Sequence, residues 1–243
     1  KHGAGEFPIK IYWAYNTELS RKIGLDYTGL LGKEVQAEIY RLREPLPETM
    51  HPRMNARGII MKYENKIVGA YIDAGRHDSF ACSLDRKSLQ DITGKGWDDW
   101  VSDHIDYNNE LEKKLSKMTP EEIIRQYYDA MDRHDQKLMF SCMTRQHLCT
   151  YLSANMDNNR LINEDFDDVF SDGEGNVKSA KLLDVKEMGG MSNEPGMKEY
   201  VVTVDYQFKK DITSSSGKQP RFLILKQESP QSGWRIHSEG TGP

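Results

Sequence analysis

The second half of the chain changes once from helical spacing to strand alternation, and this change limits the folds open to it. Three helices are predicted, at residues 119–135, 136–143 and 146–156. Four segments with alternating apolar side chains follow them, and polar or glycine-rich loops separate these segments. The segments are residues 179–188, 198–211, 219–229 and 233–242. This order predicts an α+β fold in which three helices pack on one face of an antiparallel sheet.

A helix with a well-defined start opens this half. Thr119 is a favourable N-cap, Pro120 suits the first helical position, and Glu122 follows Thr119 at the spacing of a capping box. One side of the helix carries an apolar and aromatic stripe. Its members are Ile123, Ile124, Tyr127, Tyr128 and Met131. Such a stripe either fills a core or lines a pocket, and the spacing alone favours the core.

The first half predicts a smaller α+β unit. Residues 12–31 have helical spacing, and residues 33–44 alternate as a half-buried strand does. Residues 57–73 predict a β-hairpin whose turn falls at Glu64 and Asn65. Helix and strand signals therefore follow each other closely in this part of the chain.

The boundary between the halves follows from the next helical segments. A short helix within residues 84–94 should end at Gly94, and residues 96–117 predict one amphipathic helix. A chain of 243 residues suits two domains. We therefore predict a small α+β domain at 1–95, a connecting helix at 96–117 and a second domain at 118–243.

The charge of the chain argues against a nucleic-acid partner. It has 33 basic and 38 acidic residues, a net charge of −5, and no basic stripe. The densest basic run, at 112–117, is diluted by an acid and predicts a solvated helix face. No apolar run reaches the roughly 18 residues of a membrane span, so we expect a soluble polypeptide.

Metal and cofactor chemistry finds no support in the motifs. Cys82, Cys142 and Cys149 form no C-x-x-C pair, and we expect buried free thiols. No two histidines have the four-residue spacing of metal ligands on a helix. We therefore expect no metal and no cofactor.

Two other polar segments have an ordinary explanation. His77 and Asp78 fall at the predicted end of the hairpin, and an exposed turn is favoured over an acid–base pair. Residues 163–176 are rich in acids, but Phe170 occupies a position that a calcium loop needs for a ligand. An acidic loop is the better interpretation.

The segments "PEEIIRQYYDAMDRHDQKLMFSCMT", "YVVTVDYQF", "FLILKQES" and "GWRIHSEG" resemble the nuclear transport factor two-like (cystatin-like) superfamily. The resemblance covers about half of the chain. It implies that the second domain is a cone with an open end, a site that holds a small molecule in many members.

A narrower resemblance covers the whole chain. "REPLPETM", "GAYIDAGRHDSFACSLDRKSLQDITG" and "MDNNRL" are similar to an uncharacterised family of lipid-anchored surface proteins of Gram-positive bacteria, whose second domain is a domain of unknown function. This resemblance implies a signal peptide and a lipidated cysteine upstream of Lys1. It also implies an extracytoplasmic, cell-surface location and membrane contact only through that anchor.

The superfamily resemblance also implies a candidate for chemistry. In ketosteroid-isomerase-like members a tyrosine lies eight residues before the acid that opens the second helix, as Tyr127 does before Asp135. A buried tyrosine hydroxyl can donate to a developing oxyanion. The segment after the second helix, which supplies the general base in those members, is another predicted helix here and has no acid-flanked loop. The alternation of Val204 and Tyr206 predicts that Asp205 faces the other side of its strand. We therefore assign no catalytic residue.

The candidate pocket is placed at the mouth of the cone. Its members are Tyr127, Tyr128, Met131, Tyr206, Trp234 and His237. An open cavity beside Tyr127 and His237 would favour catalysis. A cone plugged by Met131, Met139, Phe140 and Trp234 would favour packing.

The sequence supports a non-catalytic extracytoplasmic module that binds an unidentified small molecule or protein. The alternative is a small-molecule enzyme or carrier that uses the cone cavity. A third hypothesis is a structural or regulatory lipoprotein whose first domain docks on the cone. The ligand and the oligomeric state stay open.

Overall fold

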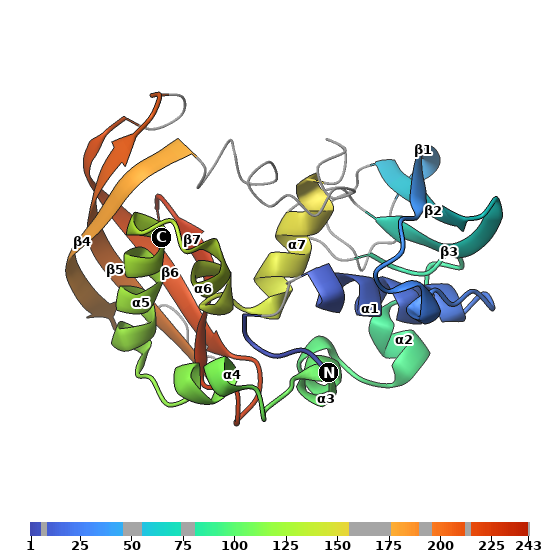
Figure 1. Ribbon diagram of the computed structural model, residues 1–243, viewed down its shortest axis with the longest axis horizontal. Coiled ribbons are helices and arrows are strands. Elements are labelled where there is room, and N and C mark those ends of the chain that lie inside the picture. The colour runs from blue at the N-terminus through green and yellow to red at the C-terminus, as the bar shows by residue number, and fades with distance from the viewer. Residues whose placement is uncertain are drawn as a thin grey trace. The chain divides into compact units, whose positions relative to one another are not determined.

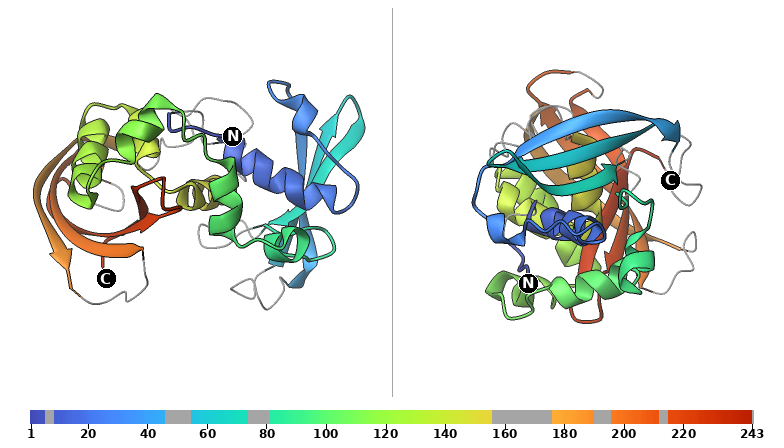
Figure 2. Two further views of the ribbon diagram at one scale, coloured as in Figure 1. Left: turned by 90° about the horizontal axis from the view of Figure 1, so that it is seen from below. Right: turned by 90° about the vertical axis from the view of Figure 1, so that its right-hand side faces the viewer.

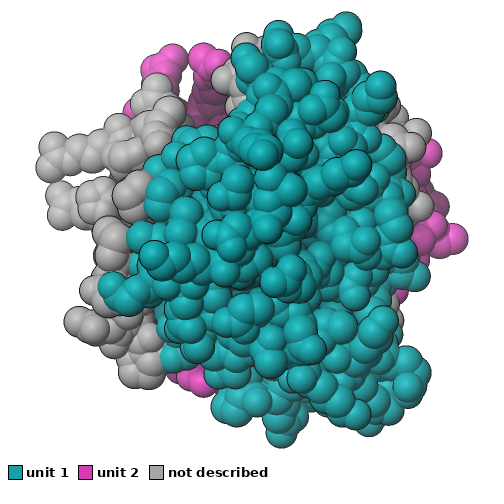
Figure 3. All heavy atoms as spheres, turned by 90° about the vertical axis from the view of Figure 1, so that its left-hand side faces the viewer, with its two compact units in different colours: residues 1–7, 101–147, 166–243 teal, residues 8–100, 148–165 magenta. Residues whose placement is uncertain are grey.

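The structure is a computed structural model that describes residues 1–5, 9–45, 55–73, 81–155, 176–189, 196–211 and 215–242 (Figure 1). The chain forms two compact units, coloured separately in Figure 3. Unit 1 comprises Lys1–Phe7, Val101–His147 and Phe166–Pro243, and unit 2 comprises Pro8–Trp100 and Leu148–Asp165. The domain ranges predicted above stay predictions. None of the helices in the described part is long and apolar enough to cross a membrane.

Unit 2 contains a three-stranded antiparallel sheet in the order β1-β2-β3, with helix α1 packed on β3. Its elements are α1 (Ile9–Arg21), η1 (Thr28–Leu30), β1 (Gln36–Pro45), β2 (Asn55–Tyr63), β3 (Lys66–Asp73) and α2 (Leu89–Thr93).

The predicted turns of unit 2 are confirmed. Glu64 and Asn65 have φ values of 48° and 62°, as a two-residue hairpin turn requires. Gly94 ends α2 in the left-handed conformation with φ 73°.

Close packing of the Tyr27 ring, just before η1, on β3 depends on Gly69. A Cβ at this position would lie 2.3 Å from a ring carbon of Tyr27, so only glycine leaves room for that ring against β3.

The prediction of one continuous helix over residues 96–117 is wrong. The structure has α3 (Trp97–His104) and α4 (Glu110–Leu115) instead. Between them, Ile105 forms a parallel bridge with His2, and the Asn109 side chain accepts hydrogen bonds from the first amides of α4. A partner distant in sequence and a new N-cap therefore interrupt the helical spacing.

Unit 1 contains a four-stranded antiparallel meander in the order β4-β5-β6-β7. Its strands are β4 (Val177–Met188), β5 (Met197–Phe208), β6 (Gly217–Gln227) and β7 (Trp234–Gly240). The sheet bends around α5 (Pro120–Asp132), which contacts β4 and β7 (Figure 2). The capping box of Thr119 and Glu122 is present, so the predicted start of α5 is confirmed.

The predicted α+β class with antiparallel sheets is confirmed, but the detail of three helices on one sheet is not. The second half does contain α5, α6 (Gln136–Ser141) and α7 (Arg145–Asn155). However, α7 leaves unit 1 after His147, and the chain has a second sheet in unit 2.

The core of unit 1 follows the alternation of its central strands. On β5 the buried side chains are Tyr200, Val202, Val204 and Tyr206. Leu223 and Leu225 continue this face on β6, and Tyr200 is the register partner of Leu223. Asp205 is half-buried and lies at an alternate position, as predicted.

Candidate functional site

A β-bulge near the end of β7 decides which side chains meet under α5. Leu225 pairs with Ile236 and Leu223 pairs with Glu239, so β7 uses one residue more than β6 between these pairs. Strict alternation from Ile236 would place Ser238 on the core face. The extra residue moves Glu239 there instead.

The Glu239 carboxylate collects three tyrosine hydroxyls. Tyr127 donates to Oε2 at 3.0 Å, and Tyr128 and Tyr206 donate to Oε1 at 3.0 and 3.2 Å. The first two tyrosines are neighbours on α5, and Tyr206 comes from β5. We call Tyr127, Tyr128, Tyr206, Glu239 and Arg221 the tyrosine–glutamate cluster.

Arg221 completes the charge balance of this cluster. Its Nε lies 3.6 Å from Glu239 Oε1, and its guanidinium carbon lies 4.9 Å from the centroid of the Tyr206 ring. A carboxylate accepts about four hydrogen bonds. Three hydroxyls and one cation therefore satisfy Glu239 within the protein.

The cluster keeps its tyrosines protonated. Burial raises the pKa of Tyr128 well above its ordinary value, and the nearby charge of Glu239 raises it further. Burial and the Glu239 charge raise the pKa of Tyr206 in the same direction. Neutral phenols beside a carboxylate act as hydrogen-bond donors and not as bases.

The other members of the predicted pocket have different contacts. Met131 is buried on α5. His237 Nδ1 lies 3.2 Å from Thr144 Oγ1, and Lys198 Nζ lies 5.8 Å from the ring centroid of Trp234. The structure therefore brings together three of the six candidates, Tyr127, Tyr128 and Tyr206.

Glu239 and Arg221 are the members that sequence analysis missed. Arg221 shares the alternation of Leu223 and Leu225, so it could have been found on the core face of its strand. Glu239 could not have been found in this way. Alternation along β7 predicts that it faces away from the core, and the bulge turns it toward the core.

A groove of about 160 Å³ lies on the β4–β7 sheet. Four of its lining residues are register partners across the four strands: Met188 pairs with Glu199, Glu199 with Ile224, and Ile224 with Ser238. These residues alternate with the buried Tyr200 and Leu223, so they lie on the opposite face of the sheet. We call this hollow the outer groove.

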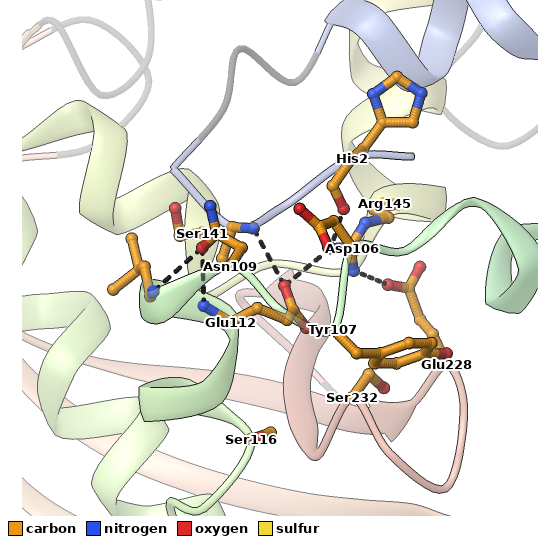
Figure 4. A network of polar contacts seen from close by, with 12 residues as sticks. His2, Asp106, Tyr107, Asn109, Glu112, Ser116, Ser141, Arg145, Glu228 and Ser232 are labelled. Atoms are coloured by element: carbon orange, nitrogen blue, oxygen red, sulfur yellow. Dashed lines mark hydrogen bonds and ion pairs between the residues drawn. The ribbon is translucent and has the colours of Figure 1, made fainter.

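Unit 1 contains a second polar cluster, whose charged side chains pair with one another (Figure 4). Glu112 on α4 forms ion pairs with Arg145 at 2.8 Å and with Arg235 at 2.9 Å. Arg145 also pairs with Glu228 at 3.1 Å, and the Ala4 amide donates to Glu112 Oε2. Two acids and two arginines balance each other, so these contacts hold α4, α7, β7 and residues 1–5 together.

The cysteines are buried free thiols, as predicted. Burial raises the pKa of Cys82 to about 11 and that of Cys142 to about 12, so neither is a reactive thiolate near neutral pH. The predicted turn at His77 and Asp78 and the acidic loop up to residue 175 lie outside the described residues.

Two family models match separate segments of the chain. Residues 1–72 match the family described as Domain of unknown function (DUF4830), and residues 121–240 match Domain of unknown function (DUF4829). Neither description names an activity, a ligand or a partner. The search of curated proteins found no match.

One solved structure is also similar to the chain. It is the crystal structure of a cystatin-like protein from Ruminococcus gnavus, which is 13% identical in sequence. The similarity covers 97% of this chain and 71% of that one, with a TM-score of 0.35.

Proposed function

We propose that this chain is a non-catalytic extracytoplasmic module that binds a protein partner or ligand. The observation that carries the proposal is the Tyr127 hydroxyl, which donates to Glu239 inside the protein. An oxyanion hole needs a donor aimed at a substrate. Here the donor and its two tyrosine neighbours are directed at a carboxylate that the protein supplies.

The size of the outer groove supports a partner over a metabolite. Small-molecule sites usually enclose about 300–1,000 Å³ and bury most of the ligand. The outer groove offers about 160 Å³, which is room for one side chain. A contact of this size contributes to binding as one part of a larger surface.

The proposal also includes the fold of the second half and the cellular location of the protein. The three helices and four-stranded meander of the second half support a cystatin-like cone. The resemblance to lipid-anchored surface proteins of Gram-positive bacteria supports a lipidated cysteine upstream of Lys1. Both features fit a module held outside the cell by its N-terminal side.

The alternative, a small-molecule enzyme or carrier, rests on one observation. The Glu239 side chain is 18% exposed and borders the outer groove, so its carboxylate is not sealed from solvent. Catalysis would require a ligand to replace at least one tyrosine hydroxyl at this carboxylate.

Site-specific photo-crosslinking tests the proposal. The chain is expressed with its natural upstream sequence in the organism that encodes it, and p-benzoylphenylalanine replaces Ile224 in the outer groove. A matched control carries the same amino acid at Asp205, on the same face of β5 but six residues from Glu199. We expect one discrete crosslinked protein with the Ile224 variant and none with the control.

Protease treatment of the same intact cells tests the extracytoplasmic location. We expect added protease to remove the protein while cytoplasmic proteins survive. Absence of a crosslink at both positions, or survival of the protein in intact cells, would contradict the proposal.

A further inference from the structure

The outer groove exists because one strand position lacks a side chain. Phe222 on β6 pairs with Gly240 on β7, so the residue opposite Phe222 has no side chain to cover its ring. Ile224 lies two residues from Phe222 on the same face of β6, and Met188 lines the groove on the other side of Glu199. Phe222 and Ile224 are both only half-buried, so the hollow presents apolar surface to solvent.

The volume limits the occupant to a group about as large as one side chain. A cavity of roughly 150 Å³ is large enough for a benzene molecule. The outer groove has about 160 Å³. It suits a slender or planar group that packs against Phe222 and Ile224.

Glu199 gives the groove its charge preference. This half-buried carboxylate has no hydrogen-bond or ion-pair partner within the described part of the chain. The adjacent Lys198 does not compensate it, because its Nζ lies 3.0 Å from Glu187. An unpaired acid beside apolar surface is complementary to a cation that carries an apolar stem.

We propose that the outer groove binds one arginine side chain from an extended segment of a partner protein. The aliphatic stem packs on Ile224, the guanidinium lies near Phe222, and its N–H groups donate to Glu199. Arginine fits better than lysine because its planar head is weakly hydrated and stacks on aromatic rings. This inference rests on the proposed binding function and names the chemistry of the partner.

N-butylguanidinium is the probe, because it has the stem and head of arginine without a peptide. Its affinity for the full chain is measured by the chemical shifts of backbone amides during a titration. We expect binding in the millimolar range, with the largest shifts at Glu199, Ile224 and Gly240. N-butylurea has the same shape without the charge, and we expect it to bind about threefold to fivefold more weakly.

Variants separate the charge from the shape. Glu199→Gln should lower the affinity for N-butylguanidinium to that of N-butylurea, and Asp205→Asn should leave it unchanged. Gly240→Val should prevent binding of both probes, because its side chain fills the space beside Phe222. A Cβ at Gly240 would lie 3.3 Å from the carbonyl oxygen of Gly242, so only a small adjustment of the chain end is needed.

The results also separate this inference from the proposed function. Equal binding of both probes, unchanged affinity in Glu199→Gln, or shifts elsewhere in unit 1 would overturn the arginine site. A crosslink at position 224 together with any of these results would still support the proposed binding function and would exclude only the preference for arginine.

Discussion

The Tyr127 hydroxyl lies 3.0 Å from Oε2 of Glu239, a residue 112 positions later in the sequence. This contact joins α5 to β7, the last strand of unit 1. It also favours packing as the role of the aromatic stripe on α5, because Tyr127 is buried and its hydroxyl is bonded within the protein. We therefore propose that binding uses the outer groove.

Glu239→Gln should destabilise unit 1 by about 1–3 kcal/mol. The amide has one acceptor oxygen where the carboxylate has two, and Arg221 loses its ion pair. The measurement is amide hydrogen exchange on β5, which reports opening of unit 1 alone. Glu199→Gln serves as the control and should change the same free energy by less than about 0.5 kcal/mol. Equal effects of the two substitutions would contradict the account of the cluster.

Glu112→Gln should have a larger effect, about 3–5 kcal/mol. Glu112 is 1% exposed and pairs with two buried arginines, so its neutralisation leaves a cation without full compensation. Glu110 on the same helix provides the control. It is 91% exposed and pairs only with Lys113, so Glu110→Gln should cost less than about 0.5 kcal/mol. Denaturant unfolding of both variants, followed by hydrogen exchange on β7, checks the difference.

Gly69→Ala should disrupt unit 2, because the added Cβ would overlap the Tyr27 ring. We expect a loss of about 1–3 kcal/mol, or more if the ring cannot move. Gly29→Ala is the control, since a Cβ there meets nothing within 4 Å. Thermal unfolding of both variants tests this, and a Gly69→Ala protein as stable as the control would show that the ring lies elsewhere.

The elements that depend on neighbouring residues were predictable from the sequence. The capping box at Thr119, the hairpin turn at Glu64 and the stop at Gly94 each depend on side chains within a few positions. Alternation likewise predicted all four strands of the meander. These signals are local, so a single sequence contains them.

The features that failed depend on partners distant in the sequence. The break after His104 coincides with the bridge between Ile105 and His2, and the face of Glu239 depends on its register with Leu223. The local sequence around residue 104 does not identify His2 as a partner, and that of β7 does not identify Leu223. Sequence analysis therefore identified the three tyrosines of the candidate site but not its acid, Glu239.

Native thiols should resist modification. Burial raises the pKa of Cys82 to about 11, so at pH 8 the folded protein keeps this thiol protonated and enclosed. We expect no fast reaction with 5,5′-dithiobis(2-nitrobenzoic acid) at pH 8, and reaction of all three thiols in guanidinium chloride. Rapid reaction of the folded protein would contradict the burial of these side chains.

The same pKa shift predicts how stability changes with pH. The unfolded thiol has a pKa of about 8.5. The stability linked to Cys82 is fully present below this pH and is lost as the pH rises toward the folded value of about 11. Unfolding midpoints between pH 8 and 11 should therefore fall less in Cys82→Ala than in the wild type, and equal slopes would contradict the shift.

A crystal structure of the chain soaked with N-butylguanidinium tests the central claim most directly. The account predicts the guanidinium beside Glu199, its stem on Ile224, and the Tyr127 hydroxyl still bonded to Glu239. A ligand bound inside unit 1, with the Tyr127 hydroxyl turned away from Glu239 toward it and an empty outer groove, would contradict the account. That result would favour an enzyme or carrier that uses the interior of the cone.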